Sequence, residues 1–288
     1  MNDAALAIGH ALFLWWFGTG VVLYLDGLPP RTFRWTVLGA TALLAAAVAA
    51  LAATRDDVSL AATHVAFAAA VMVWAWNEVL FLTGLVTGPR RSRRPADDRG
   101  WRRFRHAAET ILYHELLLAA SAAGLALLLA DSANRVGLWT FLTLWAMRLS
   151  TKLNIFLGVR NLGEAFLPDH LAYLASYFRR APMNRLFPWS VIASSAALAA
   201  LVAVAAAADT DPVDAVALSL VATLLTLAIL EHGFLVLPLD TATLWRWGFR
   251  SRAAASLTPS GAAPVAVPVP LTQDPPPQTA VDTQRRSA

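Results

Sequence analysis

Long apolar stretches separated by short polar segments dominate the pattern of this chain. Each stretch has about the length that an α-helix needs to cross a bilayer core roughly 30 Å thick, at a rise of about 1.5 Å per residue. The pattern therefore predicts an all-α, polytopic integral membrane helical bundle. Its seven expected transmembrane helices cover approximately residues 4–25, 35–54, 60–83, 107–130, 137–158, 189–208 and 214–236.

The pattern changes at two places outside these stretches. Before the sixth stretch, apolar residues return at helical spacing, which predicts a cytoplasmic amphipathic helix near 167–180. Such a helix either anchors in the headgroup plane or docks another protein. The last residues are rich in Ala, Pro, Ser, Thr and Gln and hold too little apolar surface to offset the entropy of ordering. We therefore expect a transmembrane domain at 1–248 and a disordered Pro/Ala-rich cytoplasmic tail at 249–288.

Arginine placement predicts the orientation of the bundle. Most arginines lie in the loops after the first, third and fifth stretches, among them the run Arg90–Arg105, and few lie in the other loops. The positive-inside rule then places the N-terminus in the periplasm and the C-terminus in the cytoplasm, in a bacterial inner membrane. Because these arginines flank membrane segments and no nucleic-acid-binding motif is present, we expect them to contact anionic lipids or acidic partner surfaces, with no nucleic acid partner.

Ionisable and amide side chains inside the predicted helices are the main clue to function. The chain is 57% hydrophobic and only 15% charged, and it lacks cysteine, which removes thiolate ligands and a cysteine nucleophile. Charged groups are costly in lipid, so those that remain there mark candidate functional sites. We expect an intramembrane polar cluster, toward the cytoplasmic side, made of Asn77, Glu78, Glu109, His114, Glu115, Arg148, Lys152, Asn154, Glu231 and His232.

One contact within this cluster follows from depth alone. The fourth and fifth stretches are joined by a short turn, so they are expected to be antiparallel neighbours. Counting from that turn, Glu115 lies level with Arg148 and Lys152, which are four residues apart and share one helix face. We expect a buried ion pair between Glu115 and Arg148 or Lys152. A purely structural ion-pair network is the alternative to a functional one.

Two kinds of cofactor site are open at this stage. Carboxylates and imidazoles are the ligands of di-metal helix bundles, and the candidates here are Glu78, Glu109, His114, Glu115, Glu231 and His232. Their spacing fits such a site poorly, because adjacent residues point about 100° apart on a helix. A magnesium tetrapyrrole or haem needs only one axial imidazole, for which His10, His64, His114 and His232 are candidates. No catalytic residue is predicted, and a proton relay is the weaker interpretation.

Three segments carry a family resemblance. They are WNEVLFLTGLVTGPRR from Trp76, RFRHAAETILYHE from Arg103, and the stretch from Trp139 to Pro188. Together they resemble the PuhE-type photosynthetic complex assembly family, over roughly residues 1–248. Arg160 stands where relatives are expected to have proline. The resemblance implies a polytopic membrane protein encoded beside the reaction-centre H subunit, and it transfers no catalytic roles.

The resemblance and the polar cluster together suggest two functions. The first is a membrane assembly factor in the inner (intracytoplasmic) membrane, which holds reaction-centre or light-harvesting subunits, or a bacteriochlorophyll intermediate. The alternative is a membrane metalloenzyme that acts on a tetrapyrrole or isoprenoid through the Glu/His groups.

Overall fold

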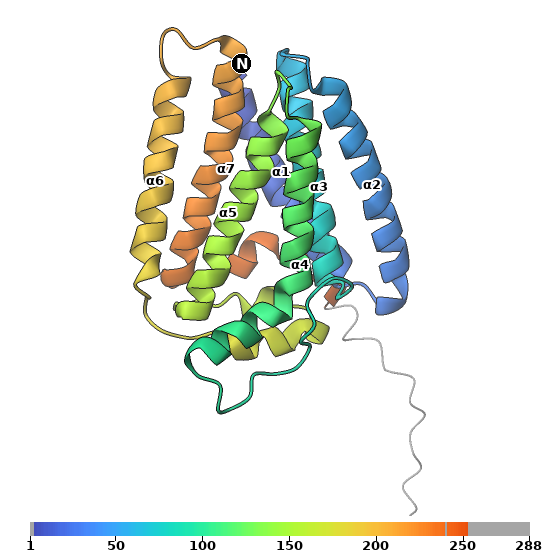
Figure 1. The fold of residues 1–288 in the computed structure, drawn as a ribbon, viewed down its shortest axis with the longest axis vertical. Helices are drawn as coiled ribbons and strands as arrows, with labels where there is room; N and C mark the ends of the chain where they lie inside the picture. Colours follow the sequence, from blue (N-terminus) through green and yellow to red (C-terminus); the bar gives the residue numbers. More distant parts are fainter. Residues whose placement is uncertain (1–2, 240, 253–288) are drawn as a thin grey trace, which may run out of the picture.

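The computed structural model describes residues 3–239 and 241–252 and contains seven α-helices, which stand side by side in one bundle (Figure 1). No β-strand occurs in these ranges, so the all-α prediction is confirmed. The helices are α1 (Asp3–Asp26), α2 (Phe33–Thr54), α3 (Leu60–Leu82), α4 (Gly100–Leu128), α5 (Val136–Leu157), α6 (Leu186–Ala205) and α7 (Pro212–Val236).

Six of these helices are long and apolar enough to cross a membrane, so the chain is a multi-pass membrane protein. The six are α1, α2 (with the short 3-10 turn Pro30–Thr32 before it), α3, α4, α6 and α7. Helix α5 has a comparable length but is not among them. Arg148, Lys152 and several hydroxyl and amide side chains interrupt its apolar sequence. The expected count of seven spans is therefore not confirmed.

Helix α3 lies at the centre of the bundle and contacts α1, α2, α4, α5 and α7. Small buried residues such as Ala66 and Ala70 let these neighbours approach closely, and Phe67 fills the space beside them. The first turn of the helix is fixed by Ser59, whose hydroxyl accepts a hydrogen bond from the backbone N–H of Ala62 at 3.2 Å. Because other helices surround α3, several of its polar residues are buried inside the bundle.

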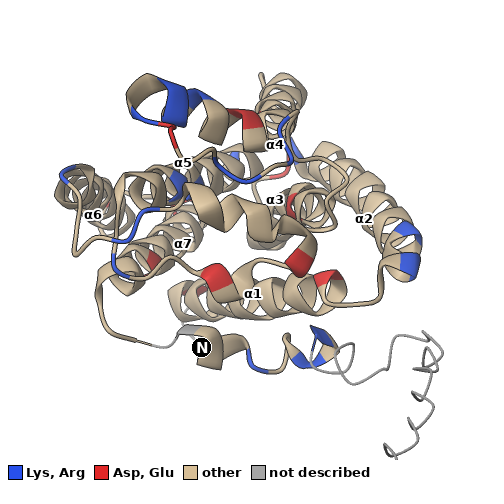
Figure 2. Ribbon diagram, turned by 90° about the horizontal axis from the view of Figure 1, so that it is seen from below, with Lys and Arg blue, Asp and Glu red and all other residues tan. Residues whose placement is uncertain are grey.

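A layer of loops and short helices closes the end of the bundle where α3 and α5 finish. Figure 2 views this end and shows Lys and Arg along its loops. The layer includes the 3-10 helices Glu164–Phe166 and Asp169–Tyr177. The second replaces the amphipathic helix expected near 167–180. Its residues Leu171 and Leu174 pack against the end of α3, so its apolar face is covered by the protein.

The loop after α3 inserts against α4 and bends it. Gly88 approaches so closely that an added Cβ would lie 2.0 Å from the backbone oxygen of Glu109. The same loop takes up backbone groups of the helix: the N–H of His114 donates to the carbonyl of Thr87 at 2.9 Å, and Arg90 N–H donates to the carbonyl of Glu109 at 3.3 Å. Insertion of a foreign group into a helical ladder causes a kink, and Figure 1 shows the lower part of α4 leaning away from the bundle axis.

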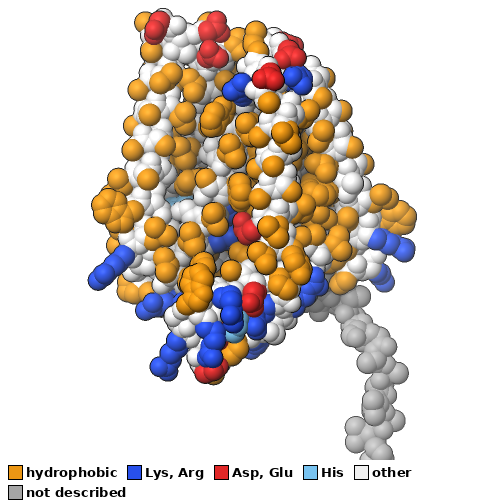
Figure 3. Space-filling view, in the orientation of Figure 1, with side chains coloured by type: hydrophobic (Ala, Val, Ile, Leu, Met, Phe, Trp, Pro, Cys, Tyr) orange, Lys and Arg blue, Asp and Glu red, His pale blue; other side chains and the backbone are white. Residues whose placement is uncertain are grey.

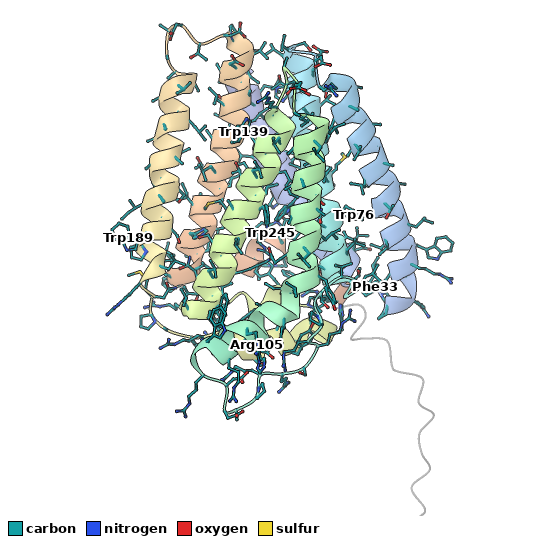
Figure 4. The ribbon with its side chains drawn as sticks, viewed as in Figure 1. Phe33, Trp76, Arg105, Trp139, Trp189 and Trp245 are labelled. Carbon is teal, nitrogen blue, oxygen red and sulfur yellow. The ribbon has the colours of Figure 1, made fainter. Side chains whose placement is uncertain are left out.

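The end of the described chain returns along α1. Residues 241–252 contain the 3-10 helix Thr241–Trp245. The indole N–H of Trp16 donates to the carbonyl of Leu244 at 3.0 Å, and Trp245 donates to the carbonyl of Trp16 at 2.9 Å. Trp245 is only 4% exposed and lies among the helices in Figure 4, whereas Trp189 projects from the outside of α6.

This packing moves the boundary of the expected disordered tail. Residues 249–252, assigned to the tail from composition, belong to the folded part, because Arg252 forms an ion pair with Asp26 at 2.7 Å. The rest of that prediction, residues 253–288, falls outside the described residues.

Candidate functional site

An ion pair joins α4 to α5 within the bundle. The ammonium of Lys152 lies 2.6 Å from Glu115 Oε1, and the indole N–H of Trp145 donates to Glu115 Oε2 at 3.2 Å. This is one of the two pairings expected from the depth of Glu115. Both charged side chains are about one-fifth exposed (20% and 21%), so they lie at the surface between the two helices rather than in the sealed interior.

Arg148 has a different environment, although it shares a helix face with Lys152. Its side chain is exposed, and within the described part of the chain it makes no hydrogen bond or salt bridge. It lies nine residues before the end of α5 at Leu157, roughly 13 Å along the axis at 1.5 Å per residue. Figure 3 shows basic and acidic side chains adjoining one another within the apolar surface over α4 and α5. We call Glu115, Arg148 and Lys152 the charged notch; all three are at least partly exposed, on α4 and α5.

Glu231 is bound from the other side of the bundle. The indole N–H of Trp15 on α1 donates to Glu231 Oε1 on α7 at 2.7 Å. Trp15 in turn packs edge-on against Trp245, with ring centroids 5.1 Å apart. Glu231 also interacts electrostatically with Arg148 over a longer distance. The carboxylate thus ties α1 to α7 beneath the returning C-terminal segment.

His114 and Glu78 form a buried pair without hydrogen bonds. His114 is fully buried, and neither of its ring nitrogens has a hydrogen-bond partner. Glu78 Oε1 lies 4.0 Å from His114 Nε2 and is also unpartnered. The ring of Phe81 covers the imidazole, with centroids 4.4 Å apart. Buried polar atoms of this kind are uncommon because each retains its desolvation cost.

His232 is also almost fully buried, but both of its nitrogens are occupied. Nε2 lies 2.8 Å from the hydroxyl of Ser150 on α5, and Nδ1 lies 2.9 Å from the carbonyl of Ala228 one turn earlier on α7. The imidazole therefore joins α7 to α5 and has no nitrogen left for another ligand.

Asn154 extends this network to α6. Its amide N–H groups donate to the carbonyl of Ser150 at 3.0 Å and to the hydroxyl of Ser190 at 3.2 Å. Its own side-chain oxygen accepts from the amide of Asn184 at 3.0 Å. Asn154 is 0% exposed, so these contacts satisfy an amide that would otherwise be costly to bury.

The remaining two residues of the expected cluster lie apart. Asn77 is fully buried and donates to the hydroxyl of Ser121 on α4 at 3.2 Å. Glu109 lies beside the loop that follows α3, where its carboxylate accepts from Arg90 at 2.9 Å. That hydrogen bond raises the pKa of Arg90. The ten residues therefore form several small groups instead of one convergent centre.

The positions of the candidate ligands differ for a di-metal site and for a tetrapyrrole site. Across the described residues no three His, Asp or Glu side chains are placed to hold one metal ion. Among the candidate axial ligands, His114 is covered by Phe81 and His232 is saturated. His10 and His64 instead lie side by side, with Nδ1 atoms 2.8 Å apart, and line an open apolar cavity of about 590 Å³ between α1 and α3.

Sequence reasoning missed the partners that satisfy the buried groups. The sequence pattern indicates apolar or interfacial roles for Trp15 and Trp145, but the indole N–H of each donates to a carboxylate. Ser150 could have been noticed, since it lies four residues before Asn154 and therefore on the same helix face. The Trp15 contact joins residues 216 positions apart, and nothing in the local pattern indicates it.

Two comparisons with known proteins agree in extent. The model of a family described as a protein of unknown function (DUF3623) matches residues 1–256. An uncharacterized 30.4 kDa protein in the puhA 5′ region of Rhodobacter capsulatus is 39% identical over 273 residues, which cover 93% of this chain and 99% of that protein. No solved structure shows significant similarity to the chain.

Proposed function

We propose that this chain, which belongs to the DUF3623 family, is a PuhE-type membrane assembly factor for bacterial photosynthetic reaction-centre and light-harvesting complexes. Support for the process comes from the relative in Rhodobacter capsulatus, which is named for a photosynthesis gene region. Support for the mechanism comes from the charged notch. The factor holds transmembrane helices of subunits against α4 and α5 until they join their complex.

Arg148 is the observation that carries the helix-holding mechanism. A guanidinium roughly in the middle of a membrane helix is costly unless it meets a counter-charge, a polar cavity or the headgroup layer. Arg148 is exposed and lies roughly 13 Å from the end of α5, so its own side chain reaches the headgroups poorly. Glu231 attracts Arg148 electrostatically but forms no salt bridge with it. An acidic or hydrogen-bonding residue on a partner helix would contact Arg148 directly. Exposed apolar residues beside the notch, such as Leu116 and Leu149, would pack on the same helix.

The proposed setting is the inner (intracytoplasmic) membrane, with α5 as the seventh span. Two observations support this arrangement. Helix α5 runs alongside α3 and α7 over the height of the bundle (Figure 1). Basic side chains gather at the end that carries the α4 bend, while few lie at the opposite end (Figure 3). By the positive-inside rule, that basic end is cytoplasmic, and the N-terminus is periplasmic.

A bacteriochlorophyll intermediate is the second cargo that we propose, and a specific observation favours one place for it. His10 and His64 line the apolar cavity between α1 and α3, and neither imidazole is fully buried. One of them could hold the central metal of a tetrapyrrole, while the hydrogen bond between the two would fix its orientation. An absorption spectrum of the purified protein tests this. Pigment that is lost on His10→Ala together with His64→Ala supports the site, and pigment that is unaffected contradicts it.

The decisive experiment uses a photosynthetic host that lacks the gene and carries a tagged full-length chain. We expect the deletion to lower the amount of reaction-centre or light-harvesting complex, and the tagged chain to co-purify with at least one of their membrane subunits. Arg148→Gln should lower that recovery roughly tenfold, equivalent to ~1.4 kcal/mol of binding.

Arg160→Gln is the matched control, because it also removes one positive charge from an exposed arginine but lies outside the helices. It should behave as wild type. A deletion strain with normal amounts of both complexes would disprove the proposed process. Equal recovery with Arg148→Gln would disprove the role of the notch.

A further inference from the structure

We propose that the layer of loops and short helices at the end of the bundle carries a binding site for a phosphate group, in a pocket of about 330 Å³. This arginine pocket is lined by Arg94, Arg99, Arg103 and Arg179, together with Asp98, Gly100 and Phe178. It lies apart from the charged notch, and the inference does not depend on the proposed assembly function.

Two of the arginines are held in place by backbone carbonyls. Arg103 donates from Nη2 to the carbonyls of Phe156 and Tyr177, both at 2.8 Å, and its guanidinium lies 4.0 Å from the centroid of the Phe156 ring. Arg94 donates to the carbonyl of Ser176 at 3.2 Å. These contacts use only part of each guanidinium and leave other N–H donors for a ligand. A ligand would therefore meet donors that have already lost their rotational freedom.

The other two arginines have no structural task of this kind. The side chains of Arg99 and Arg179 are exposed and form no hydrogen bond or ion pair within the described ranges. If the pocket existed only to join loops to helix ends, Arg94 and Arg103 would suffice. Four guanidiniums around one small cavity repel each other, and an anion would relieve that repulsion.

The acidic residue in the pocket is already neutralised. Asp98 is 2% exposed, and its carboxylate contacts the imidazole of His106 and the guanidinium of Arg102, the latter at 3.0 Å. Burial alone would raise the pKa of Asp98, but the hydrogen bond and charge of His106 and the charge of Arg102 lower it overall. The carboxylate is thus committed to α4, and no other acid lines the cavity.

Phosphate is the anion that this arrangement fits. Guanidinium groups match phosphate oxygens with paired N–H donors, and several of them can share one dianion. The pocket also lies beside Trp101, which is 75% exposed and stacks on Phe104 at 5.0 Å. An exposed tryptophan at the edge of a membrane protein marks the headgroup layer. The phosphate can come from an anionic lipid headgroup or from a soluble phosphate compound.

The test uses the purified full-length chain after detergent delipidation. Phosphatidylglycerol, phosphatidylcholine or inorganic phosphate is added, and bound lipid and the thermal unfolding midpoint are measured. The pocket variant is Arg99→Gln with Arg179→Gln. The control variant is Arg91→Gln with Arg93→Gln, which removes the same charge from exposed arginines outside the pocket.

We expect wild type and control to bind phosphatidylglycerol alike, and the pocket variant to bind it at least roughly tenfold more weakly, because charge-assisted hydrogen bonds are lost. Displacement of the lipid by millimolar inorganic phosphate would support a soluble phosphate as the ligand; resistance to displacement would support a lipid headgroup. Equal weakening of both variants would reduce the effect to general surface charge and overturn the proposal. So would unchanged binding by the pocket variant, or a lower unfolding midpoint of that variant without any ligand.

Discussion

His114 on α4 and His232 on α7 have similar neighbours in the sequence but opposite hydrogen-bonding environments in the bundle. Each is adjacent to a glutamate, and each is at most 1% exposed. His232 has a partner for both nitrogens, whereas His114 has none and lies against Phe81 and Glu78. Burial alone therefore does not reveal the role of an imidazole inside this bundle. A saturated imidazole joins helices, and an unpartnered one retains a cost that another state of the protein could relieve.

Asn154→Leu should have the largest effect, because it disrupts the hydrogen-bonded network to which His232 belongs through Ser150. This change removes the amide that links Ser150, Ser190 and Asn184 and leaves the amide of Asn184 with fewer partners. We expect the free energy of unfolding, measured in mixed detergent micelles, to fall by about 3 kcal/mol. Thr226→Ala is the control, because that hydroxyl bonds only to the carbonyl of Ala222 in its own helix. Equal losses for the two variants would show that the network holds nothing together.

Glu115→Gln tests the charged neighbour of the unpartnered imidazole. The substitution keeps the shape but leaves Lys152 facing a neutral amide, in a partly exposed place. We expect a destabilisation of roughly 2 kcal/mol, below the range for a fully buried pair because the groups are partly solvated. Combining it with Lys152→Met removes both charges and should recover most of the loss. Failure of the double variant to recover would mean that the pair does not act as a unit.

His232→Phe removes a helix-joining imidazole and keeps a ring of similar breadth. The hydroxyl of Ser150 loses its partner on α7. Interhelical hydrogen bonds in membranes contribute modestly, so we expect a loss of about 1 kcal/mol in the same unfolding assay. Adding Ser150→Ala should cost little more, because the two groups share one bond. An additive double variant would contradict that shared bond.

His114→Phe is expected to have the smallest effect, with a change within about 0.5 kcal/mol of zero or a small gain. The substitution removes two unsatisfied nitrogens and extends the contact with Phe81. The same variant should be assayed for complex assembly in the photosynthetic host. Stability close to wild type with impaired assembly would identify a functional imidazole. A large loss of stability would show that His114 has structural partners after all.

The sequence predicts all seven helices but only some of the polar contacts between them. Apolar stretches locate all seven helices, because burial in lipid or protein demands long apolar runs. The Glu115–Lys152 pair follows from counting residues from a short turn. The apolar pattern predicts that α4 begins near residue 107, which puts Glu109 among the intramembrane residues. In the structure, the arginine-rich segment from Gly100 is already helical. The polar composition of residues 100–106 hides these first helical turns from a search for apolar stretches.

Contacts between distant segments explain most of what the pattern does not reveal. The insertion of Gly88 against α4 and the return of Trp245 to α1 depend on shapes that no local periodicity encodes. Only the absence of a side chain at Gly88 hints at the first, and the short Trp-rich run near the C-terminus hints at the second. Both become visible only when the bundle is assembled in three dimensions.

Because residues 241–252 pack on α1, the order of translation determines when α1 acquires its final contacts. Asp26 and Arg252 are 226 positions apart, and Gly20 fits beneath Trp247 with no room for a Cβ. Helix α1 is translated before α2–α7, and its partner on this face is translated after all of them. Until residues 241–252 are made, Trp15, Trp16 and Asp26 lack their final neighbours, so α1 has to enter the bilayer with this face uncovered.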